Sequence, residues 1–217
     1  MPGRRLREGT KLATGCAVLA AALLLSACGS SGYHYVKSSA DRTFFKVPDD
    51  WTLYDNDTLL DSAKADLSEE EIEQLRETQW ITVFDGHPKA TLNHLANKAP
   101  KFPVGRAVVQ DLTPESADGV SLMALRNLFF EVDAMLEKEN AQVIAYEPVE
   151  RDGGFHGSHM VVKLATARGD VVVNQIAMLD QGTTKVYALA VSCSVDCYDR
   201  NQSRIEQIVD SWTVEES

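Results

Sequence analysis

The sequence lacks the short motifs that mark the common enzyme sites. It contains no G-x-S-x-G nucleophile elbow, no phosphate-binding P-loop, no G-x-G-x-x-G after a strand and no H-E-x-x-H zinc motif. Aromatic residues make up only 7% of the chain, which gives no sign of a stacking platform for carbohydrates. We therefore expect a non-enzymatic protein with no catalytic residues, no cofactor and no metal ion.

Basic residues are also scarce. The chain has 21 Lys+Arg against 32 Asp+Glu, a formal net charge of −11, and without residues 1–27 the charge becomes −14. Nucleic acids and anionic lipid head groups repel such a surface, so we expect no nucleic-acid partner. An acidic surface also serves solubility alone, and it does not by itself identify a partner.

One apolar run stands out near the N-terminus, over Leu12–Ala27, after the basic residues Arg4, Arg5, Arg7 and Lys11. It is shorter than the roughly 20 apolar residues of a transmembrane helix. It ends in Leu25-Ser26-Ala27-Cys28, which resembles the lipobox of bacterial lipoproteins. The resemblance implies a signal peptide over residues 1–27 and lipidation of Cys28, which would hold the protein at the extracytoplasmic face of the cell membrane. A plain secretory signal cut after Ala27 is the alternative.

Cysteine is rare in the rest of the chain. Cys16 falls in the signal segment and Cys28 is assigned to the lipid, so only Cys193 and Cys197 remain. Outside the cytoplasmic membrane two remaining cysteines favour a disulfide. A catalytic dithiol and a pair of free thiols stay open as alternatives, whereas a metal site needs further ligands nearby.

The chain from Cys28 onward is long enough for one domain. Residues 28–42 are small and polar, and we expect a flexible tether that carries the lipidated Cys28. A single folded domain is expected over residues 43–217, beginning with an edge strand at 43–48. Ser68 and Glu71 form a capping-box pattern inside a helical segment over residues 55–80, whose role the sequence leaves open.

Hydrophobic spacing predicts mixed secondary structure. Helices are expected over 92–98, over 122–136 and over 199–212, where apolar residues recur at helical spacing. Between the last two, the period changes to that of strands, and short glycine-containing connections predict antiparallel hairpins. The expected strands cover 143–149, 158–167, 170–180 and 183–192. The pattern predicts an α+β fold with a central antiparallel sheet flanked by helices.

The two ends of this domain resemble a known family. The opening Phe45-Lys46-Val47-Pro48-Asp49-Asp50-Trp51 and the closing Ile208-Val209-Asp210-Ser211-Trp212 are similar to those of PsbP-like and Mog-like domains, which recur in cell-envelope lipoproteins of actinobacteria. The resemblance implies an α/β/α sandwich in which Phe45, Val47 and Trp51 are core residues. It also implies a role in binding and assembly rather than catalysis.

The polar clusters give weaker signals. His156 and His159 are three residues apart and could touch one metal ion if their loop bent, but we expect exposed histidines at a strand turn instead. His87 and His94 give no sign of a catalytic or metal site. The acidic runs 69–71 and 215–216 could bind a cation, but helix capping and a frayed tail account for them.

Three hypotheses for function follow. The leading one is a membrane-anchored, non-enzymatic module that binds an envelope protein, and it requires an exposed apolar patch or groove. The second is a carrier of lipid or glycolipid, which requires an apolar pocket of several hundred Å³. The third is an envelope hydrolase, in which Ser158, His156 or His159 and Asp152 would have to converge in one cleft.

Overall fold

The computed structural model describes residues 32–96 and 100–215. The signal peptide expected over residues 1–27 and the lipidation expected at Cys28 lie outside these residues. The described residues from Tyr33 onward form one compact unit. Among the described residues, none of the helices has the length and apolar character needed to span a bilayer.

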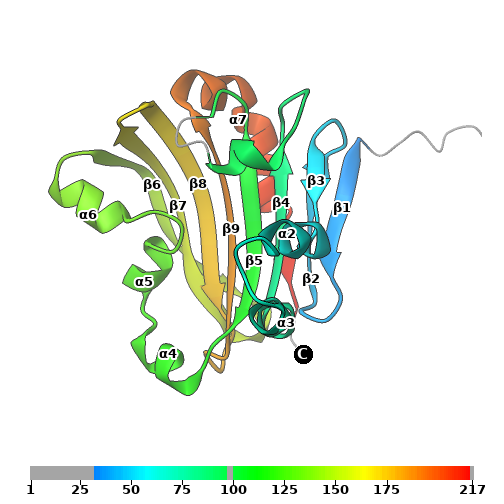
Figure 1. Cartoon of the computed structure of the whole chain (residues 1–217). Helices are drawn as coiled ribbons and strands as arrows, with labels where there is room; N and C mark the ends of the chain where they lie inside the picture. The colour runs from blue at the N-terminus through cyan, green and yellow to red at the C-terminus, as the bar shows by residue number, and fades with distance from the viewer. Residues whose placement is uncertain (1–31, 97–99, 216–217) are drawn as a thin grey trace, which may run out of the picture. The chain divides into compact units, whose positions relative to one another are not determined.

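A seven-stranded antiparallel sheet forms the centre of this unit (Figure 1). Successive side chains of a strand point to opposite faces of the sheet, so Met160 and Val162 lie on one face and Val161 lies on the other. From edge to edge its strands are β3 (Thr52–Tyr54), β4 (Gln79–Asp85), β5 (Val104–Asp111), β9 (Lys185–Ser194), β8 (Gly169–Leu179), β7 (Phe155–Thr166) and β6 (Ala141–Arg151). The four strands predicted in the C-terminal half are therefore confirmed as β6 to β9.

A second, three-stranded sheet has the order β1 (Tyr33–Ser38), β2 (Thr43–Pro48) and β10 (Thr213–Val214). The expected edge strand at 43–48 is thus β2, but it lies between two partners, so its edge position was wrong. Strand β1 pairs with β2 from Tyr33 opposite Pro48 to Ser38 opposite Thr43. Residues 33–38, expected in the tether, belong to the folded domain because this pairing satisfies their backbone groups and buries Val36.

One face of the large sheet packs against α7 (Val195–Asp210) and the small sheet. Ile205, Ile208 and Val209 of α7 are buried there, together with Phe45 and the other core residues Val47, Trp51, Phe84, Leu189 and Val191. The core positions that the family resemblance implied for Phe45, Val47 and Trp51 are confirmed, with exposed fractions of 0%, 0% and 2%.

The opposite face is covered by short helices, so the fold is α+β with helices on both sides, as predicted. Leu125 packs on β8 and β9, and Val132 packs on β7 and β8. The helices are α2 (Asn56–Ala63), α3 (Glu69–Thr78), α4 (Pro114–Gly119), α5 (Leu122–Arg126) and α6 (Val132–Glu137), with 3-10 turns η1 (Leu92–Ala96) and η2 (Asp152–Gly154).

Three of the helix predictions need correction. The segment 122–136 is not one helix but two, because the chain leaves helical geometry after Arg126 and resumes it at Val132. The segment predicted as a helix from residue 92 forms the 3-10 turn η1. Helix α7 starts at Val195, earlier than the predicted residue 199, so Cys197 lies in its first turn. The capping box of Ser68 and Glu71 is confirmed at the start of α3.

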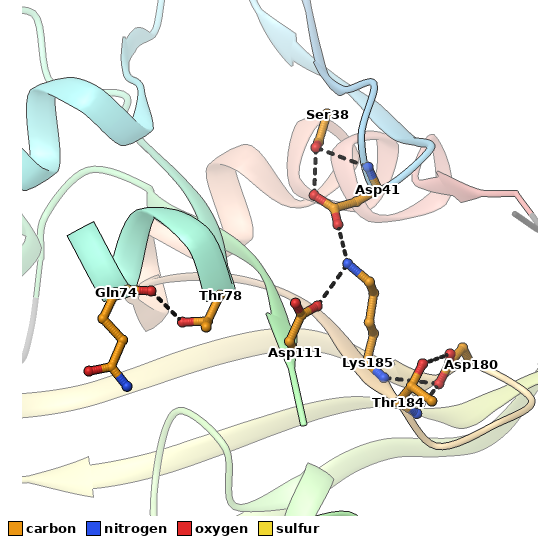
Figure 2. Close-up of polar contacts among 8 residues, drawn as sticks. All are labelled: Ser38, Asp41, Gln74, Thr78, Asp111, Asp180, Thr184 and Lys185. Atoms are coloured by element: carbon orange, nitrogen blue, oxygen red, sulfur yellow. Dashed lines mark hydrogen bonds and ion pairs between the residues drawn. The ribbon is translucent and has the colours of Figure 1, made fainter. Parts of the chain in front are cut away.

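Lys185 connects the two sheets (Figure 2). Its Nζ lies 2.8 Å from Asp41 Oδ1, in the turn after β1, and 2.8 Å from Asp111 Oδ1, at the end of β5. Asp41 also accepts a hydrogen bond of 2.6 Å from the Ser38 hydroxyl. Burial alone would lower the pKa of Lys185, but the hydrogen bonds that its ammonium donates to Asp111 and Asp41 raise it above the ordinary value.

Candidate functional site

A cavity of about 370 Å³ lies on the helix-covered face of the large sheet. Its floor comes from neighbouring strands, because Val83 of β4 lies opposite Arg106 of β5, and Arg106 lies opposite Ala190 of β9. Its walls come from α2, η1 and the connection between α5 and α6. Most of the lining is apolar: Leu59, Ile81, Val83, Leu95, Val104, Phe129, Phe130 and Ala190, with Gly105 and Ser192.

Among the described residues that line this cavity, Arg106 is the one that carries a charge. Within residues 32–96 and 100–215, no carboxylate forms an ion pair with it, and its guanidinium lies 4.6 Å from the centre of the Phe129 ring. Burial lowers the pKa of Arg106, because the cavity walls remove water from the charge without supplying an anion. The side chain still reaches solvent at the mouth of the cavity.

A smaller pocket of about 230 Å³ shares Val104 with this cavity and contains two histidines. Asp85, which is fully buried, accepts hydrogen bonds from the backbone N–H of His87 and Thr91 and lies 2.6 Å from His94 Nδ1. The ring centres of His87 and His94 are 4.6 Å apart.

The histidine pocket does not contain the parts of a hydrolytic site. In the described part of the chain, no hydroxyl or thiol hydrogen-bonds to His94, so the nucleophile of a nucleophile–base pair is missing. Asp85 instead organises the loop after β4 through its three hydrogen bonds. His87 and His94 have no distinctive spacing in the sequence, and the available signal was Asp85, which ends an apolar strand just before them.

Exposed apolar side chains gather on α5 and on β6, which is an edge strand of the large sheet. The two elements meet where the Arg126 guanidinium lies 6.0 Å from the centre of the Tyr146 ring. We call this the α5–β6 surface and define it by its large, exposed apolar residues: Leu122, Met123, Leu128, Val143, Ile144 and Tyr146. Met123 and Ile144 are the most exposed, at 60% and 56%.

The residues considered for a hydrolase or a metal site do not converge. Ser158 is buried and His159 follows it in β7, so the two side chains point to opposite faces of the sheet. His156 and His159 likewise lie on opposite faces and cannot share a metal ion. His159 is held between Glu147 Oε1 at 2.9 Å and Asn174 Oδ1 at 2.7 Å.

The remaining site predictions have mixed outcomes. Cys193 and Cys197 form a disulfide with a Cα–Cα distance of 5.8 Å, and both are fully buried. Glu71 is used in the capping box of α3. In the described ranges, no cluster of three or more potential metal ligands occurs. Glu216, part of the other acidic run, lies outside those ranges.

No family model and no curated protein matches the chain. Among solved structures, the chain is similar to cyanobacterial PsbP from Synechocystis, with 14% identity, a TM-score of 0.44, and coverage of 88% of this chain and 99% of that one. It is also similar to the Ran-binding protein Mog1p of Saccharomyces cerevisiae, with 11% identity, a TM-score of 0.44, and coverage of 85% and 96%.

A third similar structure is the immunity protein TplEi of T6SS from Pseudomonas aeruginosa, complexed with the "L" peptide. It has 9% identity and a TM-score of 0.44, with coverage of 87% of this chain and 100% of that one. PsbP and Mog1p represent the two domain types that the sequence resembles. Similarity at this level carries no argument about function, which has to come from the surfaces of the chain itself.

Proposed function

We propose that the protein is a membrane-anchored extracytoplasmic lipoprotein whose domain binds a partner protein of the cell envelope through the α5–β6 surface. The observation that carries the proposal is the gathering of six large, exposed apolar side chains on α5, on the connection that follows it and on one edge strand. Apolar groups scattered singly are normal on a protein surface, whereas a contiguous group marks an interaction site.

The edge of β6 favours docking of side chains over addition of a strand. Its pairing with β7 has an irregularity at Ile144, between Val143 and Ala145, and Pro148 within the strand lacks a backbone N–H. Bulges and prolines are devices that keep edge strands from pairing with other chains. We therefore expect the partner to cover Ile144 and Tyr146 with its own apolar side chains.

The anchor is tested by the substitution Cys28→Ala. Two acyl chains give stable membrane attachment, whereas one gives only marginal binding. We expect the native chain in the membrane fraction after cell lysis and the Cys28→Ala chain in the soluble fraction. Retention of Cys28→Ala with the membranes, at the level of the native chain, would contradict lipid anchoring.

The binding surface is tested by photo-crosslinking in intact cells. A photoreactive amino acid is placed at Met123 or Ile144, and a matched control carries it at Ser203, an exposed residue of α7. We expect the same discrete crosslinked product from 123 and 144, lost on Tyr146→Lys, and none from 203. The proposal fails if 123 and 144 yield no product, or if 203 yields the same one.

A further inference from the structure

We propose that the cavity around Arg106 binds a monoanionic amphiphile: a carboxylate with an unbranched apolar tail. In this arrangement the carboxylate pairs with the Arg106 guanidinium, and the tail lies along the apolar floor formed by β4, β5 and β9. This site is distinct from the α5–β6 surface, and its ligand is a small molecule rather than a protein.

The charge of Arg106 is the first argument. Three arginines of the described chain have carboxylate partners: Arg76 pairs with Glu73, Arg126 with Asp133 and Arg204 with Asp50. Arg106 has the Phe129 ring instead, and it borders an apolar cavity while its side chain stays exposed to solvent. A carboxylate matches the planar guanidinium with two parallel hydrogen bonds, and it would supply a counter-charge that the described residues do not provide.

The surroundings limit the ligand to one negative charge. Asp85 lies on the same face of the sheet as the cavity, opposite Val104 in the β4–β5 pairing, and it is fully buried. A second negative charge would be repelled by Asp85 and by the net charge of −11. Polyanions and nucleotides would meet more of this repulsion than a single carboxylate does.

The lining and volume define the tail. A cavity of about 370 Å³ is at the small end of the range for small-molecule sites, about 300–1,000 Å³. It takes one chain, and not the several chains of a complex membrane lipid. The aromatic and aliphatic walls, with Phe129 and Phe130 on one side and Leu59 and Leu95 on the other, offer no partner for a polar tail.

The test is calorimetric titration of the purified protein with dodecanoate below its micelle concentration. Dodecan-1-ol and dodecyltrimethylammonium have the same tail with no charge and with a positive charge, and dodecyl phosphate has a different anionic head. We expect one dodecanoate per chain, weaker binding of the alcohol and no binding of the cation. Equal binding of the cation would overturn the proposal, and so would tighter binding of dodecyl phosphate.

Three variants separate the head from the tail. Arg106→Gln should weaken dodecanoate about tenfold or more while leaving the alcohol unchanged, because only the charged contact is lost. Ala190→Leu, which fills the floor, should weaken both ligands. Arg151→Gln, at the exposed end of β6, should weaken neither. An Arg106→Gln variant that keeps its circular dichroism spectrum and binds dodecanoate as tightly as the native chain would refute the site.

Discussion

Gly105 shows how closely the core next to the cavity is packed. A Cβ built on Gly105 would lie 2.1 Å from the Phe84 ring, and Phe84 is itself fully buried against Phe45 and Trp51. We expect Gly105→Ala to lower the free energy of unfolding by about 1–3 kcal/mol, since the ring has no room to move. Urea unfolding followed by fluorescence measures this change.

Gly119 provides the matched control for that substitution. It ends α4, has no positive φ, and a Cβ there would meet nothing within 4 Å. We expect Gly119→Ala to leave the unfolding midpoint unchanged or to raise it slightly. If the two alanine variants lose the same stability, the packing of Phe84 over Gly105 is not the cause.

Glu71 makes a pH-dependent contribution at the start of α3. Its pKa is lowered because its carboxylate accepts a backbone hydrogen bond from Ser68 N–H and a side-chain bond from the Ser68 hydroxyl. A lowered pKa in the folded state means that the contribution is present above the ordinary pKa and is lost as the pH falls through the folded value. Glu71→Gln keeps a hydrogen-bond acceptor but cannot titrate.

We therefore expect the native chain to be more stable than Glu71→Gln at neutral pH, with the difference shrinking in acid below the ordinary glutamate pKa of 4.5. Urea unfolding at a series of pH values measures the difference. Glu70→Gln, in the same helical turn but outside the capping box, should show a smaller change with pH. A constant difference for Glu71→Gln would show that the charge does not stabilise the cap.

At the scale of elements, Lys185 holds the β1–β2 turn on the large sheet. Lys185→Met keeps much of the aliphatic side chain but removes the bonds to Asp41 and Asp111. We expect a loss of about 1.5–3 kcal/mol in unfolding free energy, the range for hydrogen bonds to charged groups. Faster hydrogen exchange in β1, measured by mass spectrometry, should accompany it.

The raised pKa of Lys185 also determines how its contribution to stability changes with pH. The stabilisation is complete below the ordinary lysine pKa of 10.5, and it is lost as the pH rises through the higher folded value. The native chain should therefore approach Lys185→Met in stability only at strongly alkaline pH. If hydrogen exchange in β1 of Lys185→Met were as slow as in the native chain, the pairing with β2 alone would hold this strand.

Elements specified by neighbouring residues could be predicted from the sequence, and those specified by distant contacts could not. The capping box of α3 depends on Ser68 and Glu71 alone, so the spacing revealed it. The break between α5 and α6 depends on Asn127, whose side chain donates to Met123 O and Asp133 Oδ2 and accepts from Asp133 N–H. Those hydrogen bonds compete with continuation of the helix, and the spacing of the apolar residues gives no sign of them.

Strand β1 and the cavity illustrate the same distinction. Residues 33–38 are too polar to predict a strand, and only pairing with β2 gives their backbone groups partners. The cavity brings together Ile81, Arg106, Phe129 and Ala190 from separate strands and one connection. The sequence did contain one usable signal, a lone arginine within the apolar strand β5, which had no predicted partner.

At the scale of the whole molecule, the two faces of the large sheet have different roles. The face under α7 carries the disulfide and the largest buried cluster, and it has the packing of a structural core. The other face has two smaller clusters, the cavity between its covering elements, and the α5–β6 surface at its edge. Short helices leave a sheet partly uncovered, so binding sites can form there without opening the main core.

The unbalanced charge predicts how the whole domain responds to salt. The net charge of −11 makes the compact state repel itself, and salt screens that repulsion within a Debye length of about 8 Å at physiological ionic strength. Ion pairs such as Lys185–Asp41 weaken under the same screening, but unpaired carboxylates outnumber them. We expect the urea midpoint to rise between about 0.02 M and about 0.5 M NaCl. The urea midpoint of Lys185→Met should rise further, because this variant lacks that ion pair and is one charge more negative. A midpoint that falls with salt would mean that the ion pairs outweigh the repulsion.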